Sequence, residues 1–359
     1  MSIFTVGRTW KVWKNWAKDA YMVAHASLPL QASKAIAGLE FKIASVPRVH
    51  HDKTVHPGGG LARGAITFSI DFELSWGWQY AKVQTEGFVA KGLREREQVP
   101  ELLAQFDAHR IPVTWATVGH LFLSGCTRGA QGLAHPDLPR LRPFETRNWK
   151  FAGGDWYQFD PCSDVKSHPS WYAPDLIEKI LSSPTKHEVA CHSFSHAGFG
   201  PYCPREVALA ELDACKAAMA SFSLEPTTWV FPGDDEGNFP VLAEKGIRVV
   251  RCFPKAAVSI SLPLRRDDGI WGVPVASAIE RGKYWAINQR LARLQRFVDV
   301  AAATKLAAHF WFHPSLPRSD MQGVLFPLLE YCANQRDKGL VDILTMEQLV
   351  AATDTAGAS

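Results

Sequence analysis

The chain has 359 residues, a length that suits one large α/β barrel with extensions or two domains. Its 47% hydrophobic and 21% charged residues indicate an ordinary globular core. This composition excludes a disordered chain, a collagen-like repeat and a coiled coil. The formal net charge of +3 is too small to favour nucleic acid as the main partner.

Residues 1–60 are expected to form a helical N-terminal extension and a Gly-rich linker. They hold eight Lys or Arg and three Asp or Glu residues, so 8 − 3 = +5, and the basic character of the chain lies here. Trp10, Trp13 and Trp16 recur among lysines in this extension. The tryptophans favour a helix packed on the body, because tryptophan is highly buried on average. The alternative is peripheral contact of residues 1–50 with the anionic inner face of a membrane.

The protein is expected to be cytoplasmic. Its seven cysteines show no paired spacing, which is typical of reduced thiols. Basic residues interrupt the first 30 residues, where a signal peptide needs an apolar core. No apolar run approaches the roughly 18–20 residues of a membrane-spanning helix.

Residues 61–352 are predicted to form a deformed (β/α) barrel of seven or eight strands, followed by a flexible tail over residues 353–359. Apolar runs predict strands at residues 65–74, 111–118, 188–192, 227–232, 248–253, 272–276 and 307–312, and an eighth near 340–344. Helical patterns alternate with these runs, which favours a closed parallel sheet. An open doubly wound sheet is the alternative.

Prolines and glycines mark the ends of the predicted helices. Pro100 and Pro204 are expected in the first turns of helices, and Gly246 and Gly339 directly after helix ends. One long interruption, residues 121–173, follows a predicted strand. Barrels keep substrate contacts in such loops.

The first predicted strand carries two acids on one face. Polar and apolar residues alternate strictly along residues 67–75, so Asp71 and Glu73 project together, about 7 Å apart. Two adjacent carboxylates repel one another unless a cation or a shared proton relieves them. This face is expected to line the mouth of the barrel, and solvated acids on an edge strand are the alternative.

His192 and His196 come directly after another predicted strand. Histidines four residues apart share one face of a helical turn and can bind one divalent ion. His309 and His313 have the same spacing on a predicted strand, which would hold them about 13 Å apart and prevent a shared metal. His313, at the end of that strand, is placed to donate a proton, whereas His309 is expected inside the barrel.

In chain order these segments resemble the motifs of the polysaccharide deacetylases, the NodB-homology enzymes of carbohydrate esterase family four. The segments are Asp71-Phe-Glu73, His192-Ser-Phe-Ser-His196, Phe231-Pro-Gly233 and Phe312-His-Pro314. The resemblance covers about residues 64–350 and implies a metal-dependent hydrolase of amide bonds that removes acetyl groups from N-acetylated sugars.

The resemblance also implies a role for each residue. Asp71 would be the general base and His313 the general acid. Glu73, His192 and His196 would bind one divalent transition metal, with zinc expected first and cobalt, nickel or iron as alternatives. The metal and a backbone N–H near Gly233 would stabilise the oxyanion.

Two departures from the family pattern matter. Phe72 separates the acids of the first motif, and the second acid is a glutamate where the usual motif has an aspartate. The third motif lacks its usual arginine and continues with Asp234 and Asp235. Either Arg251 or Arg205 is therefore expected to orient the base, or the base is tuned in a different way.

Substrate contacts are expected from aromatic and acidic residues, because sugars stack their apolar faces on Trp or Tyr. The predicted substrate-binding set is Trp156, Tyr157, Asp160, Gly233, Asp234 and Trp271. Core packing of the two tryptophans, and a solvated turn at Asp234, are the alternatives.

Together these features predict a cytoplasmic N-deacetylase of surface-polysaccharide biosynthesis. Its substrate would be an N-acetylated sugar on a nucleotide, a lipid or a growing glycan. Two alternatives stay open: an allantoinase-like hydrolase of cyclic amides, and a glycan-binding pseudoenzyme.

Overall fold

The computed structural model describes residues 47–49, 61–83, 86–253, 260–282 and 285–357. Apart from residues 47–49, the predicted N-terminal extension and linker lie outside the described residues, and so does the segment predicted to contact a membrane. Among the helices of the described part, none is both long and apolar enough to cross a membrane.

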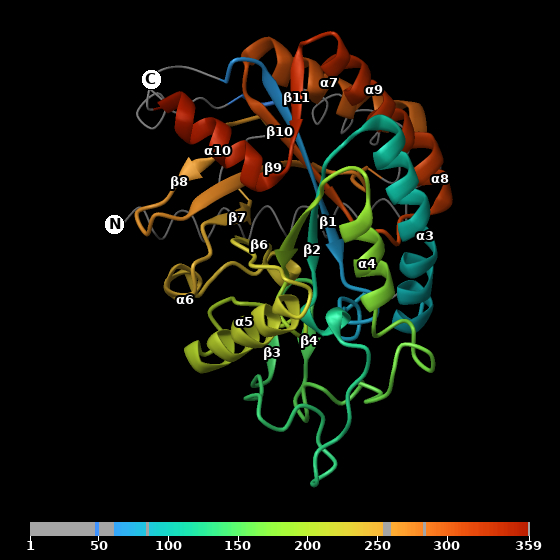
Figure 1. The fold of residues 1–359 in the computed structure, drawn as a ribbon, viewed down its shortest axis with the longest axis vertical. Coiled ribbons are helices and arrows are strands. Elements are labelled where there is room, and N and C mark those ends of the chain that lie inside the picture. Colours follow the sequence, from blue (N-terminus) through green and yellow to red (C-terminus); the bar gives the residue numbers. More distant parts are fainter. Residues whose placement is uncertain (1–46, 50–60, 84–85, 254–259, 283–284, 358–359) are drawn as a thin grey trace, which may run out of the picture.

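A closed parallel barrel of seven strands forms the body of the protein (Figure 1). In their order around the ring, the strands are β10 (Ala307–Phe312), β1 (Gly64–Phe72), β2 (Thr114–Thr117), β5 (Glu188–Cys191), β6 (Thr228–Trp229), β7 (Val249–Cys252) and β9 (Trp271–Ala278). β9 pairs with β10 and closes the ring. All seven strands lie where the sequence predicts them, and the closure confirms the barrel over the open sheet.

The predicted eighth strand is β11 (Val341–Leu344), which pairs in parallel with the first residues of β1. Three further strands of two residues each are too short to show a periodic pattern in the sequence. β3 (Phe144–Glu145) and β4 (Lys150–Phe151) form an antiparallel hairpin inside the long interruption, and β8 (Leu264–Arg265) pairs with β9. In Figure 1 the interruption extends from the lower end of the barrel.

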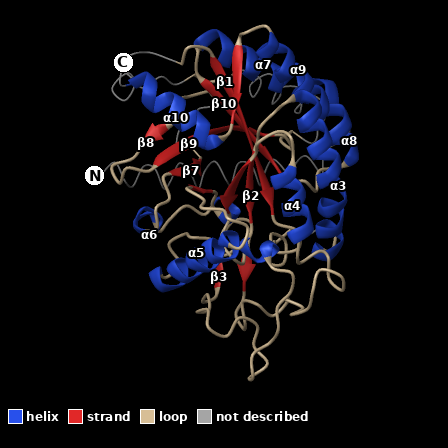
Figure 2. Ribbon diagram, viewed as in Figure 1, coloured by secondary structure: helices blue, strands red, loops and turns tan. Residues whose placement is uncertain are grey.

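Helices surround the strands (Figure 2). They are α3 (Phe88–His109), α4 (Pro174–Ser182), α5 (Arg205–Ala220), α6 (Phe239–Glu244), α7 (Ile287–Thr304), α8 (Arg318–Asp320), α9 (Phe326–Asp337) and α10 (Met346–Gly357). Three short helical turns, η1 (Gly119–Phe122), η2 (Pro232–Asp234) and η3 (Met321–Leu325), complete the described part.

The helix ends agree only partly with the sequence prediction. Gly246 and Gly339 follow α6 and α9 with φ values of 78° and 72°, as expected for glycines after helices. Pro204 lies one residue before α5, at its N-cap. Pro100 lies in the interior of α3, because that helix already begins at Phe88, so its predicted place in a first turn is wrong.

The predicted flexible tail is wrong over residues 353–357, which belong to α10. Thr353 is buried, and its hydroxyl donates to the carbonyl of Leu349 at 2.8 Å. Helix α10 therefore continues beyond residue 352, where the predicted barrel ends.

Candidate active site

The polar face of β1 points into the barrel. Ser69 Oγ lies 2.7 Å from Nε2 of His309 on β10, and it accepts a hydrogen bond from Arg251 at 3.2 Å. Arg251 belongs to β7, which is not a neighbour of β1 in the ring, so this contact crosses the interior. Asp71 and Glu73 are buried at the C-terminal end of the same face. β1 pairs along both edges, which excludes a solvated edge strand.

Glu73, His192 and His196 converge on one point. Glu73 Oε1 lies 3.0 Å from His192 Nε2 and 3.2 Å from His196 Nε2, and the three side chains are buried. His192 Nδ1 lies 2.9 Å from the carbonyl of Val230. A carbonyl only accepts, so Nδ1 carries a proton, and in the neutral imidazole the Nε2 lone pair faces Glu73.

This arrangement fits a divalent metal. A carboxylate oxygen and the lone pair of His192 repel each other unless a cation lies between them. Glu73 Oε2 is also buried and has no hydrogen-bond partner among the described residues. Two histidines and one carboxylate leave further metal positions open, as catalytic sites require.

An irregular loop, and not the expected helical turn, brings the two histidines together. Ser193 and His196 have left-handed backbone, with φ values of 54° and 61°. The buried carboxylate of Glu211, on α5, accepts from two consecutive backbone N–H groups of this loop at 3.0 and 2.9 Å. It also accepts from the hydroxyl of Ser195 at 2.6 Å. Glu211 therefore replaces the internal hydrogen bonds that a helix would have supplied.

Arg251 orients Asp71. Each of its two terminal nitrogens donates to one oxygen of the Asp71 carboxylate, with an Nη2–Oδ2 distance of 2.7 Å. Arg251 also donates to Asp234 at 3.3 Å. Arg205, the other candidate, pairs with Glu244 at the surface. The cation absent from the third motif is thus supplied by the next strand of the barrel.

His313 directly follows β10 and faces two carboxylates. Its Nδ1 lies 3.2 Å from Glu280 Oε1, and its Nε2 lies 3.7 Å from Glu73 Oε1. Burial alone would lower the pKa of His313, but the charges of Glu280 and Glu73 raise it well above its usual value. The imidazolium form is therefore favoured, and it can donate a proton at neutral pH.

Two residues shape the turn that carries Glu73. Glu95, on α3, accepts from the backbone N–H groups of Glu73 at 2.9 Å and Leu74 at 3.2 Å. Burial, followed by the charge of Glu73, raises the pKa of Glu95 to about 8. At Gly77 an added Cβ would lie 1.6 Å from Glu73 Oε2, so only glycine leaves room for this carboxylate.

Three half-buried tryptophans surround the centre. The rings of Trp78 and Trp311 lie 4.9 and 5.4 Å from that of His313, and the ring of Trp149 lies 5.9 Å from that of His196. Trp149 belongs to the turn between β3 and β4. Its indole would lie 3.2 Å from a Cβ at Gly233, the predicted oxyanion residue, which has a φ of 65°.

The predicted substrate-binding residues do not all lie at this centre. Gly233 and Asp234 lie beside it, through the contacts with Trp149 and Arg251. Trp271 is the first residue of β9, at the end of the strand opposite to the one that leads to Glu280.

The predicted residues of the long interruption are buried away from the centre. Trp156 Nε1 donates to Ser195 Oγ at 2.8 Å, and the hydroxyl of Tyr157 donates to Glu211 at 2.9 Å. Both aromatic residues thus support the loop between His192 and His196. Asp160 is buried in a separate cluster.

Glu95, Glu211 and Glu280 are absent from the sequence prediction. Glu95 lies among the buried residues of α3, and Glu211 among those of α5. An acid inside the apolar stripe of a helix is unusual, so the helical periodicity held a signal for both. Glu280 follows the end of β9 and has no comparable signal.

No protein-family model matches the sequence, and a search of curated proteins finds no match. Solved structures do match. A protein assigned as a polysaccharide deacetylase from Mycobacterium smegmatis is 16% identical, with a TM-score of 0.56 over 86% of this chain and 94% of that one. One so assigned from Pseudomonas aeruginosa PAO1 is 11% identical, with a TM-score of 0.54 over 80% and 90%. The Puue allantoinase is 12% identical, with a TM-score of 0.52 over 81% and 90%. The chain thus has the barrel fold that the polysaccharide deacetylases share with this allantoinase.

Proposed function

We propose that this protein is a metal-dependent hydrolase that removes the acetyl group from an N-acetylated sugar. The observation that carries the proposal is the convergence of Glu73, His192 and His196 on one point. Asp71, which Arg251 orients, and His313, whose pKa is raised by its carboxylate neighbours, lie beside this point. This geometry supports a site in which metal ligands, a base and an acid surround one point at the C-terminal end of the barrel.

Glu73, His192 and His196 would hold one divalent transition metal, which when bound polarises the acetamide carbonyl and the attacking water. Asp71 accepts the proton of that water as its oxygen bonds to the carbonyl carbon. Arg251 holds the Asp71 carboxylate in place through hydrogen bonds to both of its oxygens. His313 donates its proton to the amine nitrogen as the C–N bond breaks, and acetate leaves.

The rim of the centre suits a carbohydrate. Trp149 is partly buried beside His196, and the apolar face of a sugar ring can stack on an indole. Trp78 and Trp311 are also partly buried, with Lys91 and Arg251 over their rings at 3.0 and 4.6 Å. Asp234, about one-third exposed, can accept hydrogen bonds from sugar hydroxyls. These contacts support an N-acetylated sugar of a surface polysaccharide as the substrate, and a cytoplasmic site of action remains a prediction of the cysteine pattern.

Acetate release tests this proposal. Purified wild type, His192→Ala and the surface control His168→Ala are incubated with chitooligosaccharides, with a nucleotide-linked N-acetylhexosamine and with allantoin, and the metal content of each variant is measured. We expect wild type and His168→Ala to release acetate from one of the sugars. His192→Ala is expected to lose that activity and one equivalent of metal per chain.

Turnover of allantoin without acetate release would replace the proposal with cyclic-amide hydrolysis. Sugar binding without turnover, unchanged in Asp71→Asn, would instead identify a pseudoenzyme. Equal metal content in wild type and His192→Ala would refute the metal centre.

A further inference from the structure

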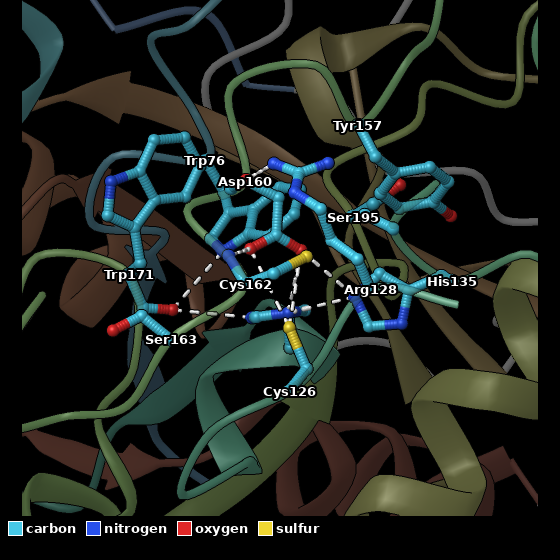
Figure 3. Close-up of polar contacts among 12 residues, drawn as sticks. Trp76, Cys126, Arg128, His135, Tyr157, Asp160, Cys162, Ser163, Trp171 and Ser195 are labelled. Carbon is cyan, nitrogen blue, oxygen red and sulfur yellow. Dashed lines mark hydrogen bonds and ion pairs between the residues drawn. The ribbon is translucent and has the colours of Figure 1, made fainter. Parts of the chain in front are cut away.

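A second group of metal-binding side chains lies outside the candidate active site. The donor atoms of His120, Cys126, His135 and Asp160 all lie within 4.8 Å of one another. The side chains of His120 and Asp160 are fully buried, and those of Cys126 and His135 are partly buried. Figure 3 shows Cys126 and His135 directed at the carboxylate of Asp160. None of the four residues has a role in the proposed reaction.

Four of the six distances between these donor atoms match those around a tetrahedral ion, and the other two lie within 4.8 Å. Metal bonds of about 2.0–2.1 Å to nitrogen and oxygen place two such ligands about 3.3 Å apart, and a thiolate at about 2.3 Å lies about 3.5 Å from a ligand oxygen. His120 Nε2 lies 3.1 Å from His135 Nε2 and 3.3 Å from Asp160 Oδ2. His135 Nε2 lies 3.0 Å from the same oxygen, and Cys126 Sγ lies 3.6 Å from it.

With both histidines neutral, the protons of this cluster do not satisfy all of its lone pairs. His120 Nδ1 faces the carbonyl of Trp171 at 3.4 Å, which places its proton on Nδ1 and leaves a lone pair on Nε2. His135 can donate its single Nε2 proton to His120 or to Asp160. In either case the lone pairs of His120 Nε2 and Asp160 Oδ2 face each other in a buried site, where such repulsion is costly. A cation between them removes it.

Surrounding groups hold the four side chains in place, as they do in known metal sites. The backbone N–H of Cys162 donates to Asp160 Oδ1 at 2.8 Å, and the hydroxyl of Tyr172 lies 3.3 Å from Cys126 Sγ. Arg128 donates to the backbone carbonyl of Asp160 at 2.8 Å.

We propose that His120, Cys126, His135 and Asp160 form a structural zinc site, separate from the catalytic metal. Four protein ligands of the types that zinc prefers close the coordination sphere, which marks a structural and not a catalytic ion. His120 lies in η1, directly after β2, whereas the other three ligands come from the long interruption. The ion therefore ties the interruption to the C-terminal end of the barrel.

The site also supports the loop between the two catalytic histidines. The backbone N–H of His120 donates to the carbonyl of Phe194 at 2.9 Å. The rings of His120 and His135 lie 5.4 and 5.1 Å from that of Phe194, which sits between His192 and His196 in the chain. A structural ion here would fix the wall against which this loop packs.

Cobalt spectroscopy distinguishes this site from the catalytic one. A thiolate bound to Co²⁺ gives a charge-transfer absorption in the near ultraviolet, and Glu73, His192 and His196 contribute no sulfur. Metal-free full-length protein is titrated with Co²⁺, and bound cobalt and absorption are measured together. We expect wild type to bind two ions per chain and to show the charge-transfer band. His192→Ala should keep the band with one ion fewer.

Two cysteine variants identify the ligand. Cys126→Ala is expected to lose the band and one ion, whereas the matched control Cys162→Ala, which removes the neighbouring thiol, keeps both. If Cys126→Ala fails to fold, Asp160→Asn, which preserves side-chain volume, is expected to lose the second ion.

A wild type without the band, or a band that survives Cys126→Ala or disappears in Cys162→Ala, would overturn the assignment. Two ions retained in Asp160→Asn would do the same. None of these results depends on acetate release, so failure of this proposal is distinguishable from failure of the deacetylase proposal.

Discussion

Replacement of Arg251 by methionine is expected to destabilise the protein by about 3–5 kcal/mol, because it leaves a buried carboxylate without its cation. The side chains of Arg251 and Asp71 are 1% and 4% exposed, and both terminal nitrogens of Arg251 donate to that carboxylate. At about 2–4 °C per kcal/mol for a large domain, this loss lowers Tm by roughly 6–20 °C. The Asp71 carboxylate also loses its orientation, so acetate release by Arg251→Met should decrease as well as its stability.

Two further variants separate the ion pair from general damage. The double variant Arg251→Met/Asp71→Asn is expected to recover most of the lost stability but no activity. The buried charge of Asp71 is removed together with its cation, and Asp234, the other partner of Arg251, is 35% exposed to solvent. Arg290→Met is the matched control. Arg290 donates to both oxygens of Asp320, at 2.8 and 2.7 Å, in a buried pair between α7 and α8. This variant should lose comparable stability and retain acetate release in its folded fraction.

Urea unfolding followed by tryptophan fluorescence gives the free energies of unfolding, and acetate release at a temperature where each variant is folded gives the activities. The reasoning is refuted if Arg251→Met unfolds within about 1 kcal/mol of wild type. It is also refuted if the double variant is no more stable than Arg251→Met.

Two other variants test the turn that carries Glu73. Gly77→Ala is expected to displace the Glu73 carboxylate, because its Cβ would lie 1.6 Å from Oε2, and so to lose the catalytic metal in a folded chain; unchanged metal content would contradict this. Glu95→Gln tests the pKa of Glu95, which burial raises from 4.5 to about 8. The protonated acid stabilises the fold fully below pH 4.5, and this contribution is lost as pH rises through about 8. Since the amide stays neutral, the free energy of unfolding of Glu95→Gln should rise relative to wild type by up to about 1.4 kcal/mol per pH unit between these limits. Urea unfolding at several pH values measures this difference. A difference between the two proteins that does not change with pH would contradict the prediction.

The periodicity of the chain was sufficient to predict the strands, whereas the pairing of β9 with β10 established that they close into a barrel. All seven barrel strands and β11 lie at predicted positions, because buried parallel strands leave apolar runs that local sequence records. The alternation along β1 likewise placed Asp71 and Glu73 on one inward face. One helix start was predicted wrongly: Pro100 lies inside α3, because that helix already begins at Phe88.

The loop that brings His192 and His196 together could not be predicted from their spacing. Their convergence depends on left-handed backbone and on the carboxylate of Glu211, which comes from a different helix. The composition of the long interruption likewise did not show which of its residues contact substrate and which support this loop. The structure assigns Trp156 and Tyr157 to the support of this loop.

The strands, and the residues that face inward from them, could be read from the sequence, because strand and helix periods are local properties of the chain. The partners of those residues depend on the folded arrangement of the whole barrel. In the folded protein Arg251, and not Arg205, contacts Asp71. Glu280 lies beside His313, and Asp160 lies beside His120. Such contacts join side chains far apart in sequence, and they are set by the closure of the barrel and the path of its long loop, which no local pattern encodes.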